Sequence, residues 1–195
     1  SGTVKRVALQ PHPTLVECMA IVIETDPNQE ETFWEERSNW NELSREEMIE
    51  AIANAGIVGL GGATFPTYRK LRLPPEIKID TLIINGAECE PYLTSDHRLM
   101  LENADGIISG SLLLGKILGV KQIIIGIEDN KTDVGESLQK SINELNSSLK
   151  PTLGWCNTRY PQGSEKQLIE ALTGRVVSAG KLPMHVGVMV QNVAT

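Results

Sequence analysis

Two short runs rich in isoleucine constrain the fold of this chain more than any other feature. Residues 81–84 and 122–127 are apolar at consecutive rather than alternating positions, which is typical of strands buried on both faces of a parallel sheet. Apolar residues at helical spacing fill residues 99–118 between the runs, and we expect two helical segments there that divide near Asn103. This alternation predicts a Rossmann-like α/β domain in which helices flank a parallel sheet.

Further helices are predicted on either side of this unit. Ser44 and Glu47 form a capping-box pattern ahead of apolar residues at helical spacing, and Gly56 is a natural stop. Residues 131–149 repeat apolar side chains every three or four positions, and residues 167–172 form a shorter helix.

Between the first predicted helix and the first predicted strand lies a loop rich in glycine. Gly59, Gly61 and Gly62 lack a Cβ atom, so a ligand can approach the backbone closely. Pro66 suits the first position of a helix, whose N-terminal amides and Lys70 would attract an anion. The spacing fits neither a P-loop nor a dinucleotide fingerprint. The loop is therefore either a phosphate seat of a third kind or an ordinary glycine-rich turn.

Two further segments carry polar residues at the ends of predicted elements. Asn85, Glu88 and Glu90 follow the first predicted strand, at the edge where such sheets collect ligands. Their amide and carboxylate groups suit a heterocycle and sugar hydroxyls, although a turn with solvated acids explains them equally well. A glycine turn at residues 160–165 leads into the last predicted helix, and Ser164 is either a ligand contact or a helix cap.

Composition excludes several classes of function. The 195 residues suffice for one sizeable domain, and a formal net charge of −7 argues against nucleic acid as a partner. The longest apolar stretch, residues 107–120, is interrupted and shorter than the roughly 20 residues of a membrane span. Three distant cysteines and three scattered histidines lack metal-ligand spacing, which favours a reducing, cytoplasmic compartment and no metal site in this chain.

Three regions of the chain differ in residue composition and in the pattern of apolar residues. Residues 1–25 contain short apolar runs around a proline-rich turn, which predicts a small β segment. Residues 26–43 are acidic and aromatic and are expected to be a linker, and residues 44–195 form the α/β domain. The β segment is too short for a core of its own, so we expect the chain to be a fragment of a longer protein.

Several motifs in order resemble those of one known family, the RnfC subunits of Rnf electron transport complexes, which are related to the FMN-binding and NADH-binding subunit of respiratory complex I. The motifs are the opening Ser-Gly-Thr-Val-Lys, then Gly-Leu-Gly-Gly-Ala-Thr-Phe-Pro-Thr, Ile-Asn-Gly-Ala-Glu-Cys-Glu-Pro-Tyr-Leu, Asp-His-Arg-Leu-Met, Ile-Glu-Asp-Asn-Lys, Tyr-Pro-Gln-Gly-Ser-Glu and Val-Gln-Asn-Val-Ala-Thr. Together they cover nearly the whole chain.

The resemblance implies FMN as the cofactor and NADH as the substrate. An aromatic ring at Phe65 would stack on the adenine of NADH, and Glu165 would lie near its nicotinamide. The implied FMN contacts are Gly59, Gly61, Gly62, Lys70, Asn85, Glu88, Gly163, Ser164, Glu165, Gln191 and Asn192. This chain has Ala87, Cys89 and Ser164 where the complex I relative has more polar or acidic residues, and the replaced acids remove negative charge beside the flavin.

The resemblance also implies a place in a larger assembly. The expected activity is that of an NADH:acceptor oxidoreductase subunit, in which hydride passes from NADH to FMN and electrons pass on to 4Fe-4S clusters. Those clusters belong to a C-terminal region that is absent here, and residues 1–25 match the end of a barrel-sandwich module. The expected partners are other subunits of an ion-translocating bacterial complex, with this subunit peripheral on the inner face of the cell membrane. A cobalamin-reducing flavoprotein and a docking scaffold without flavin chemistry are the alternatives.

Overall fold

A computed structural model describes residues 2–13, 15–28 and 39–195. The chain divides into two units, Ser1–Ser38 and Asn39–Thr195. Most of the predicted linker, residues 29–38, lies outside the described residues.

The first unit is an antiparallel hairpin of β1 (Gly2–His12) and β2 (Val16–Thr25). The pairing runs from Gly2 opposite Thr25 to His12 opposite Val16, with an irregularity between Val4 and Arg6. The short β segment expected from the sequence is therefore two paired strands. Its apolar side chains are largely exposed, as a two-stranded ribbon cannot bury them.

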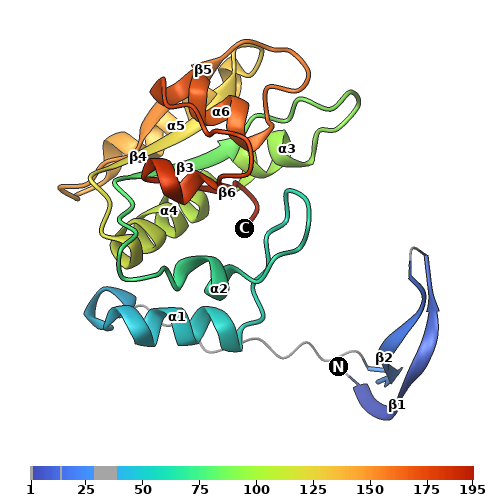
Figure 1. The fold of residues 1–195 in the computed structure, drawn as a ribbon. Helices are drawn as coiled ribbons and strands as arrows, with labels where there is room; N and C mark the ends of the chain where they lie inside the picture. The colour runs from blue at the N-terminus through green and yellow to red at the C-terminus, as the bar shows by residue number, and fades with distance from the viewer. Residues whose placement is uncertain (1, 14, 29–38) are drawn as a thin grey trace. The chain divides into compact units, whose positions relative to one another are not determined.

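The second unit contains a four-stranded parallel sheet with the strand order β5-β4-β3-β6 (Figure 1). The strands are β3 (Thr81–Gly86), β4 (Gln122–Glu128), β5 (Thr152–Cys156) and β6 (Val188–Asn192). The predicted strands at residues 81–84 and 122–127 are thus confirmed as the two central strands. The sequence interpretation missed β5 and β6.

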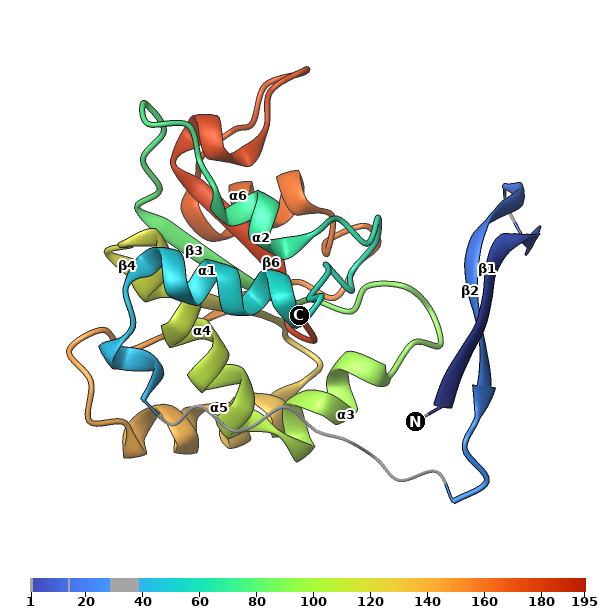
Figure 2. The same ribbon diagram turned by 90° about the horizontal axis from the view of Figure 1, so that it is seen from below.

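Helices cover both faces of this sheet (Figure 2). The helices of the unit are α1 (Arg45–Asn54), α2 (Thr67–Leu71), α3 (Ser95–Glu102), α4 (Ala104–Leu118), α5 (Thr132–Glu144) and α6 (Glu165–Thr173), with 3-10 turns at Trp40–Glu42 and Pro183–Val186. Side chains of α3, α4 and α5 pack with Leu82 and Ile84 of β3 on one face, and α6 packs with Ile83 on the other. Because neighbouring residues of β3 are buried on opposite faces, its sequence shows no alternation.

The helix boundaries agree with the sequence in some places and differ in others. Asn103 separates α3 from α4, as predicted. Gly174 follows α6 in a left-handed conformation and ends it. The helix predicted over residues 131–149 is wrong in length, because α5 ends at Glu144 and residues 145–151 form a loop.

A third apolar cluster fixes the two helices that carry the glycine-rich loop. Met48 and Ile49 of α1 are buried with Leu71 of α2 and Ile117 of α4. Arg45 reinforces this packing, since its guanidinium donates to the carbonyls of Ile117 and Leu71 at 2.8 Å each. The start of the glycine-rich loop is thereby held against the body of the domain. Among the described helices, none is both long and apolar enough to cross a membrane.

The predicted capping box at the start of α1 yields a stability test. The hydroxyl of Ser44 accepts from the Glu47 N–H at 3.3 Å, and the Glu47 carboxylate accepts from the Ser44 N–H at 2.8 Å. We expect Ser44→Ala to lower the free energy of unfolding by about 1 kcal/mol in urea denaturation, because an N–H of the first turn loses its partner. The matched control is Ser148→Ala, an exposed loop position, and equal stability of the two variants would contradict the capping role.

Candidate functional site

The carboxyl ends of β3 and β6 open into a cleft of about 680 Å³. Four separate segments of the chain line it: the glycine-rich loop with α2, the segment after β3, the turn before α6, and the end of β6. Every residue that the sequence pointed to as a cofactor or substrate contact lies on its wall: Gly59, Gly61, Gly62, Phe65, Lys70, Asn85, Glu88, Gly163, Ser164, Glu165, Gln191 and Asn192. The fold therefore brings residues up to 133 positions apart in sequence, Gly59 and Asn192, to one place.

The glycine-rich loop presents a row of unpaired backbone amides. Its base is closed by two hydrogen bonds, from the Gly59 N–H to the Phe65 carbonyl at 2.9 Å and from the Thr67 N–H to the Ile57 carbonyl at 3.0 Å. Above this base, the N–H groups of residues 61–65 donate no hydrogen bond to any described residue. Consecutive free amides in a loop form a seat for an anion.

The glycines of this loop serve different purposes. A Cβ atom on Gly61 would lie 2.8 Å from the Cβ of Asn192, so glycine is required there for the loop to rest on the end of β6. A Cβ on Gly59 would make an ordinary contact with the Phe65 carbonyl at 3.6 Å, and one on Gly62 would meet nothing within 4 Å. Glycine at these two positions leaves the backbone bare rather than solving a packing problem.

The helix after the loop contributes less than the sequence suggested. Pro66 precedes α2 at its N-cap instead of occupying the first helical position, and α2 has five residues. The N–H of Thr67 at its start is used by the Ile57 carbonyl. The expectation that the free amides of this helix point into the loop is therefore wrong for Thr67, and the run of amides without a described partner lies in the loop, at residues 61–65.

Lys70 lines the cleft and binds two groups distant in sequence. Its ammonium donates to the carbonyl of Val190 in β6 and lies 3.4 Å from the carboxylate of Glu165 at the start of α6. The ammonium thus joins α2 to β6 and to the start of α6. The charge is shared with Glu165, which leaves part of its donor capacity for a ligand.

Side-chain amides form the central part of the wall. Asn85 and Asn192 are paired neighbours at the ends of β3 and β6. The Asn85 amide donates to the Gly163 carbonyl at 2.9 Å and accepts from the Ala87 N–H at 3.1 Å, so it joins two lining segments. Gln191 is 4% exposed, and its Nε2 has no partner among the described residues. A buried donor without a partner is costly, which marks this amide as a group that a ligand can satisfy.

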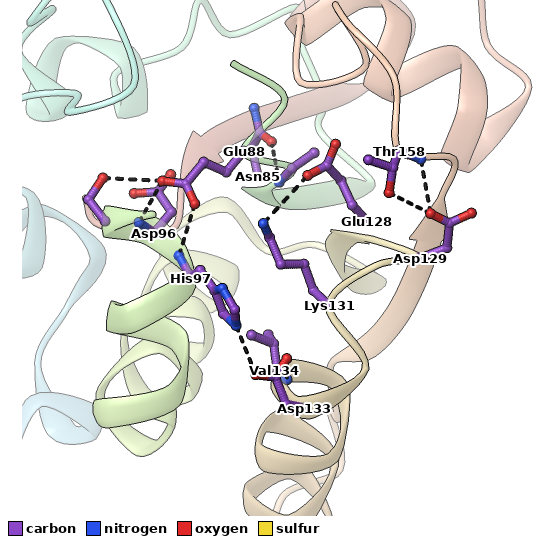
Figure 3. A network of polar contacts seen from close by, with 12 residues as sticks. Asn85, Glu88, Asp96, His97, Glu128, Asp129, Lys131, Asp133, Val134 and Thr158 are labelled. Carbon is purple, nitrogen blue, oxygen red and sulfur yellow. Dashed lines mark hydrogen bonds and ion pairs between the residues drawn. The ribbon is translucent and has the colours of Figure 1, made fainter. Parts of the chain in front are cut away.

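Glu88 is engaged with the start of α3 (Figure 3). Its carboxylate accepts from the N–H of Asp96 at 3.0 Å, from the N–H of His97 at 3.3 Å and from the hydroxyl of Ser95 at 3.3 Å. It therefore supplies the cap that Thr94, at the N-cap position, does not provide with its own side chain. The sequence interpretation assigned Glu88 to ligand hydroxyls and did not foresee this capping role.

Asp96 is a lining residue that the sequence interpretation did not single out. It accepts from the side-chain amide of Asn192 at 2.8 Å. Burial raises the pKa of Asp96, the hydrogen bond from Asn192 opposes that rise, and the nearby Glu88 adds to it. Its membership of the Asp-His-Arg-Leu-Met motif was visible in the sequence, but its partner lies 96 positions away.

Behind the cleft, the end of β4 carries a second acidic group (Figure 3). Glu128 is 1% exposed, and its Oε2 lies 3.9 Å from the ammonium of Lys131 while its Oε1 has no partner among the described residues. Burial raises the pKa of Glu128, and Lys131 opposes this effect. Neither residue is among those that line the cleft.

Comparison with known proteins gives a match over most of the chain. Residues 52–195 match the family described as the Nuo51 FMN-binding domain. Among curated proteins, the chain is 49% identical to the C subunit of the proton-translocating ferredoxin:NAD(+) oxidoreductase complex of Clostridium ljungdahlii. It is 45% identical to the C subunit of the Na(+)-translocating ferredoxin:NAD(+) oxidoreductase complex of Acetobacterium woodii. These matches confirm the resemblance to the RnfC family.

The matches cover this chain completely and the relatives only in part. Both matches cover 100% of this chain but 42% and 44% of the relatives, so the chain spans less than half of their length. Among solved structures, two states of an NAD+-reducing [NiFe]-hydrogenase resemble the chain with TM-scores of 0.64 and 0.68 at 23% and 24% identity. These two cover 78% and 77% of this chain and 29% of the hydrogenase chain in each case, and they confirm the α/β fold.

The close contact between two lining segments yields a prediction. A Cβ atom on Gly163 would lie 2.2 Å from the backbone carbonyl of Ala87. Because a backbone atom cannot move aside cheaply, we expect Gly163→Ala to lower the free energy of unfolding by about 1–3 kcal/mol, measured by urea denaturation.

The control for this variant is Gly110→Ala in α4, where a Cβ would meet nothing within 4 Å. Alanine in a helix should leave that protein equally stable or more stable by about 0.5–1 kcal/mol. If the two alanine variants behave alike, the close approach of the two segments is not a constraint.

Proposed function

The chain belongs to the Nuo51 FMN-binding domain family, and on that premise we propose that it binds FMN in the cleft between β3 and β6 and serves as an NADH-oxidising electron-transfer module. The observation that carries this proposal is the row of amides at residues 61–65 that have no partner among the described residues. These residues line the cleft together with Gln191, whose buried Nε2 has no described partner either. The loop amides suit a phosphate, and the Nε2 of Gln191 suits an acceptor atom of a heterocycle.

The lining residues fit FMN in chemistry and in extent. A volume of about 680 Å³ lies within the range of roughly 300–1,000 Å³ that small-molecule sites occupy. In this proposal the amides of the glycine-rich loop hold the phosphate, and Lys70 supplies positive charge from the cleft wall. Gln191 offers an amide to the ring system, while Asn85 and Asn192, whose amides are bonded to other parts of the chain, line the cleft beside it. The remaining proposed contacts are Gly59, Gly61, Gly62, Glu88, Gly163, Ser164 and Glu165.

Bound FMN would supply a ring that takes up a hydride and releases electrons one at a time. The residues of the chain must then hold a dinucleotide beside it. Phe65 is 52% exposed on the cleft wall, so its ring can stack on an adenine. Glu165, paired with Lys70, is the proposed neighbour of the nicotinamide. Face-to-face placement of donor and acceptor is the main contribution that a protein makes to such a transfer.

The proposal extends to the whole protein of which this chain resembles a part. By analogy with its relatives, we infer a subunit of an ion-translocating oxidoreductase complex, whose partners are the other subunits. Electrons would leave through 4Fe-4S clusters in a further region, and the subunit would lie peripherally on the cytoplasmic side of a bacterial membrane. Residues 44–195 are the proposed FMN-binding and NADH-binding domain, and residues 1–25 are the proposed end of a separate β module.

The phosphate seat can be tested with two ligands that differ in the phosphate alone. We expect the chain to quench FMN fluorescence on binding and to bind FMN at least about tenfold more tightly than riboflavin, because charge-assisted hydrogen bonds from the loop amides are lost without phosphate. Equal affinity for the two ligands would place the phosphate outside the loop, and no binding of either would overturn the proposal.

The redox role needs a second measurement. We expect NADH, added anaerobically to the FMN-loaded chain, to bleach the visible absorbance of the flavin faster than it bleaches free FMN at the same concentration, because the cleft aligns the two rings. A bound flavin that reacts no faster than free FMN would instead favour the docking-scaffold alternative.

A further inference from the structure

Asn192, at the end of β6, connects the sheet to the glycine-rich loop. Its side-chain oxygen accepts from the Ala194 N–H at 2.8 Å, and its backbone carbonyl accepts from the Thr195 N–H at 3.0 Å. These bonds close a tight turn after β6. Thr195 lies in this turn, and its hydroxyl accepts from the N–H of Leu60 in the glycine-rich loop at 3.1 Å.

The side chain of Asn192 also limits how the loop can approach. The position that a Cβ would take on Gly61 lies 2.8 Å from the Cβ, 3.1 Å from the Nδ2 and 3.2 Å from the Cγ of Asn192. The loop therefore rests directly on this side chain. Rotation of the Asn192 amide would move its Nδ2 and Cγ away from Gly61 and would break the bond from the Ala194 N–H, one of the two that close the turn carrying Thr195.

A single carboxylate fixes the outer end of this amide. Asp96 Oδ2 accepts from Asn192 Nδ2 at 2.8 Å and, together with the bond from the Ala194 N–H to Asn192 Oδ1, orients the amide. Asp96 is itself held, because its N–H donates to Glu88 at 3.0 Å at the start of α3. A continuous series of contacts thus runs from α3 through Asp96 and Asn192 to the loop amides.

We propose that Asp96 is a positioning residue for the anion seat: it orients Asn192 so that the turn after β6 and the glycine-rich loop hold residues 61–65 in their open arrangement. This inference rests on the proposed function, since it takes FMN as the ligand. It adds a residue that need not touch the cofactor but determines whether the phosphate is recognised.

The test compares FMN and riboflavin on Asp96 variants of the 195-residue chain. Asp96→Ala removes the acceptor for Asn192, and we expect about a tenfold loss of FMN affinity with riboflavin affinity changed by less than about twofold. Asp96→Asn keeps an oxygen in the same place, and we expect it to retain the wild-type preference for FMN. Asp105→Ala, an exposed acid in the first turn of α4, is the matched control and should behave as wild type.

If Asp96 has a merely structural role, Asp96→Ala should weaken the binding of FMN and riboflavin by the same factor, or lower the melting temperature without changing the ratio of the two affinities. Either result would overturn the inference, as would an Asp96→Asn protein that loses the FMN preference. If Asp96→Ala does not fold, Asp96→Ser takes its place, because a serine hydroxyl at this position is too short to reach Asn192. Failure of the wild-type chain to bind FMN would instead overturn the proposed function, so the two failures are distinguishable.

Discussion

Parallel pairing of β3 with β6 is the interaction on which the rest of the site depends. It places Asn85 opposite Asn192, so that the carboxyl ends of two strands distant in sequence present these two side-chain amides side by side, and it places Gln191 opposite Ile84. The pairing is stable because both faces of β3 are covered, with Leu82 and Ile84 buried on one side and Ile83 on the other. A one-residue slip of β6 would remove Asn192 from its place beside Asn85 and would turn every side chain of β6 to the opposite face of the sheet.

The polar groups around the cleft divide into two kinds. Asn85, Glu88 and Asp96 use their hydrogen-bonding capacity mainly on other parts of the chain, and so hold the lining segments together. The amides of residues 61–65 and the Nε2 of Gln191 have no such partners among the described residues. In a site that is organised before its ligand arrives, the groups that hold the walls together already have their hydrogen-bond partners, and the groups left for the ligand do not. The cleft shows this arrangement.

The sequence allowed the central strands, the capping box at Ser44 and the separation of α3 from α4 to be predicted, because each depends on residues close together in the chain. It did not reveal β5, in which Gly154 and the half-exposed Trp155 interrupt the apolar run, nor the five-residue β6. The family motifs pointed to the lining residues of the cleft. The engagement of Lys70 with Val190 could not be foreseen, because the two lie 120 positions apart and meet through tertiary packing alone.

The bare amides of residues 61–65 have a consequence for how the protein would behave in solution. An N–H group that bonds to nothing but water exchanges its hydrogen for deuterium without any opening of the fold. In the ligand-free chain this short segment should therefore exchange at close to the intrinsic rate, although it joins two helices fixed by a buried cluster. Mass spectrometry of peptides across the loop would then report occupancy of the seat directly, even for a ligand with neither colour nor fluorescence.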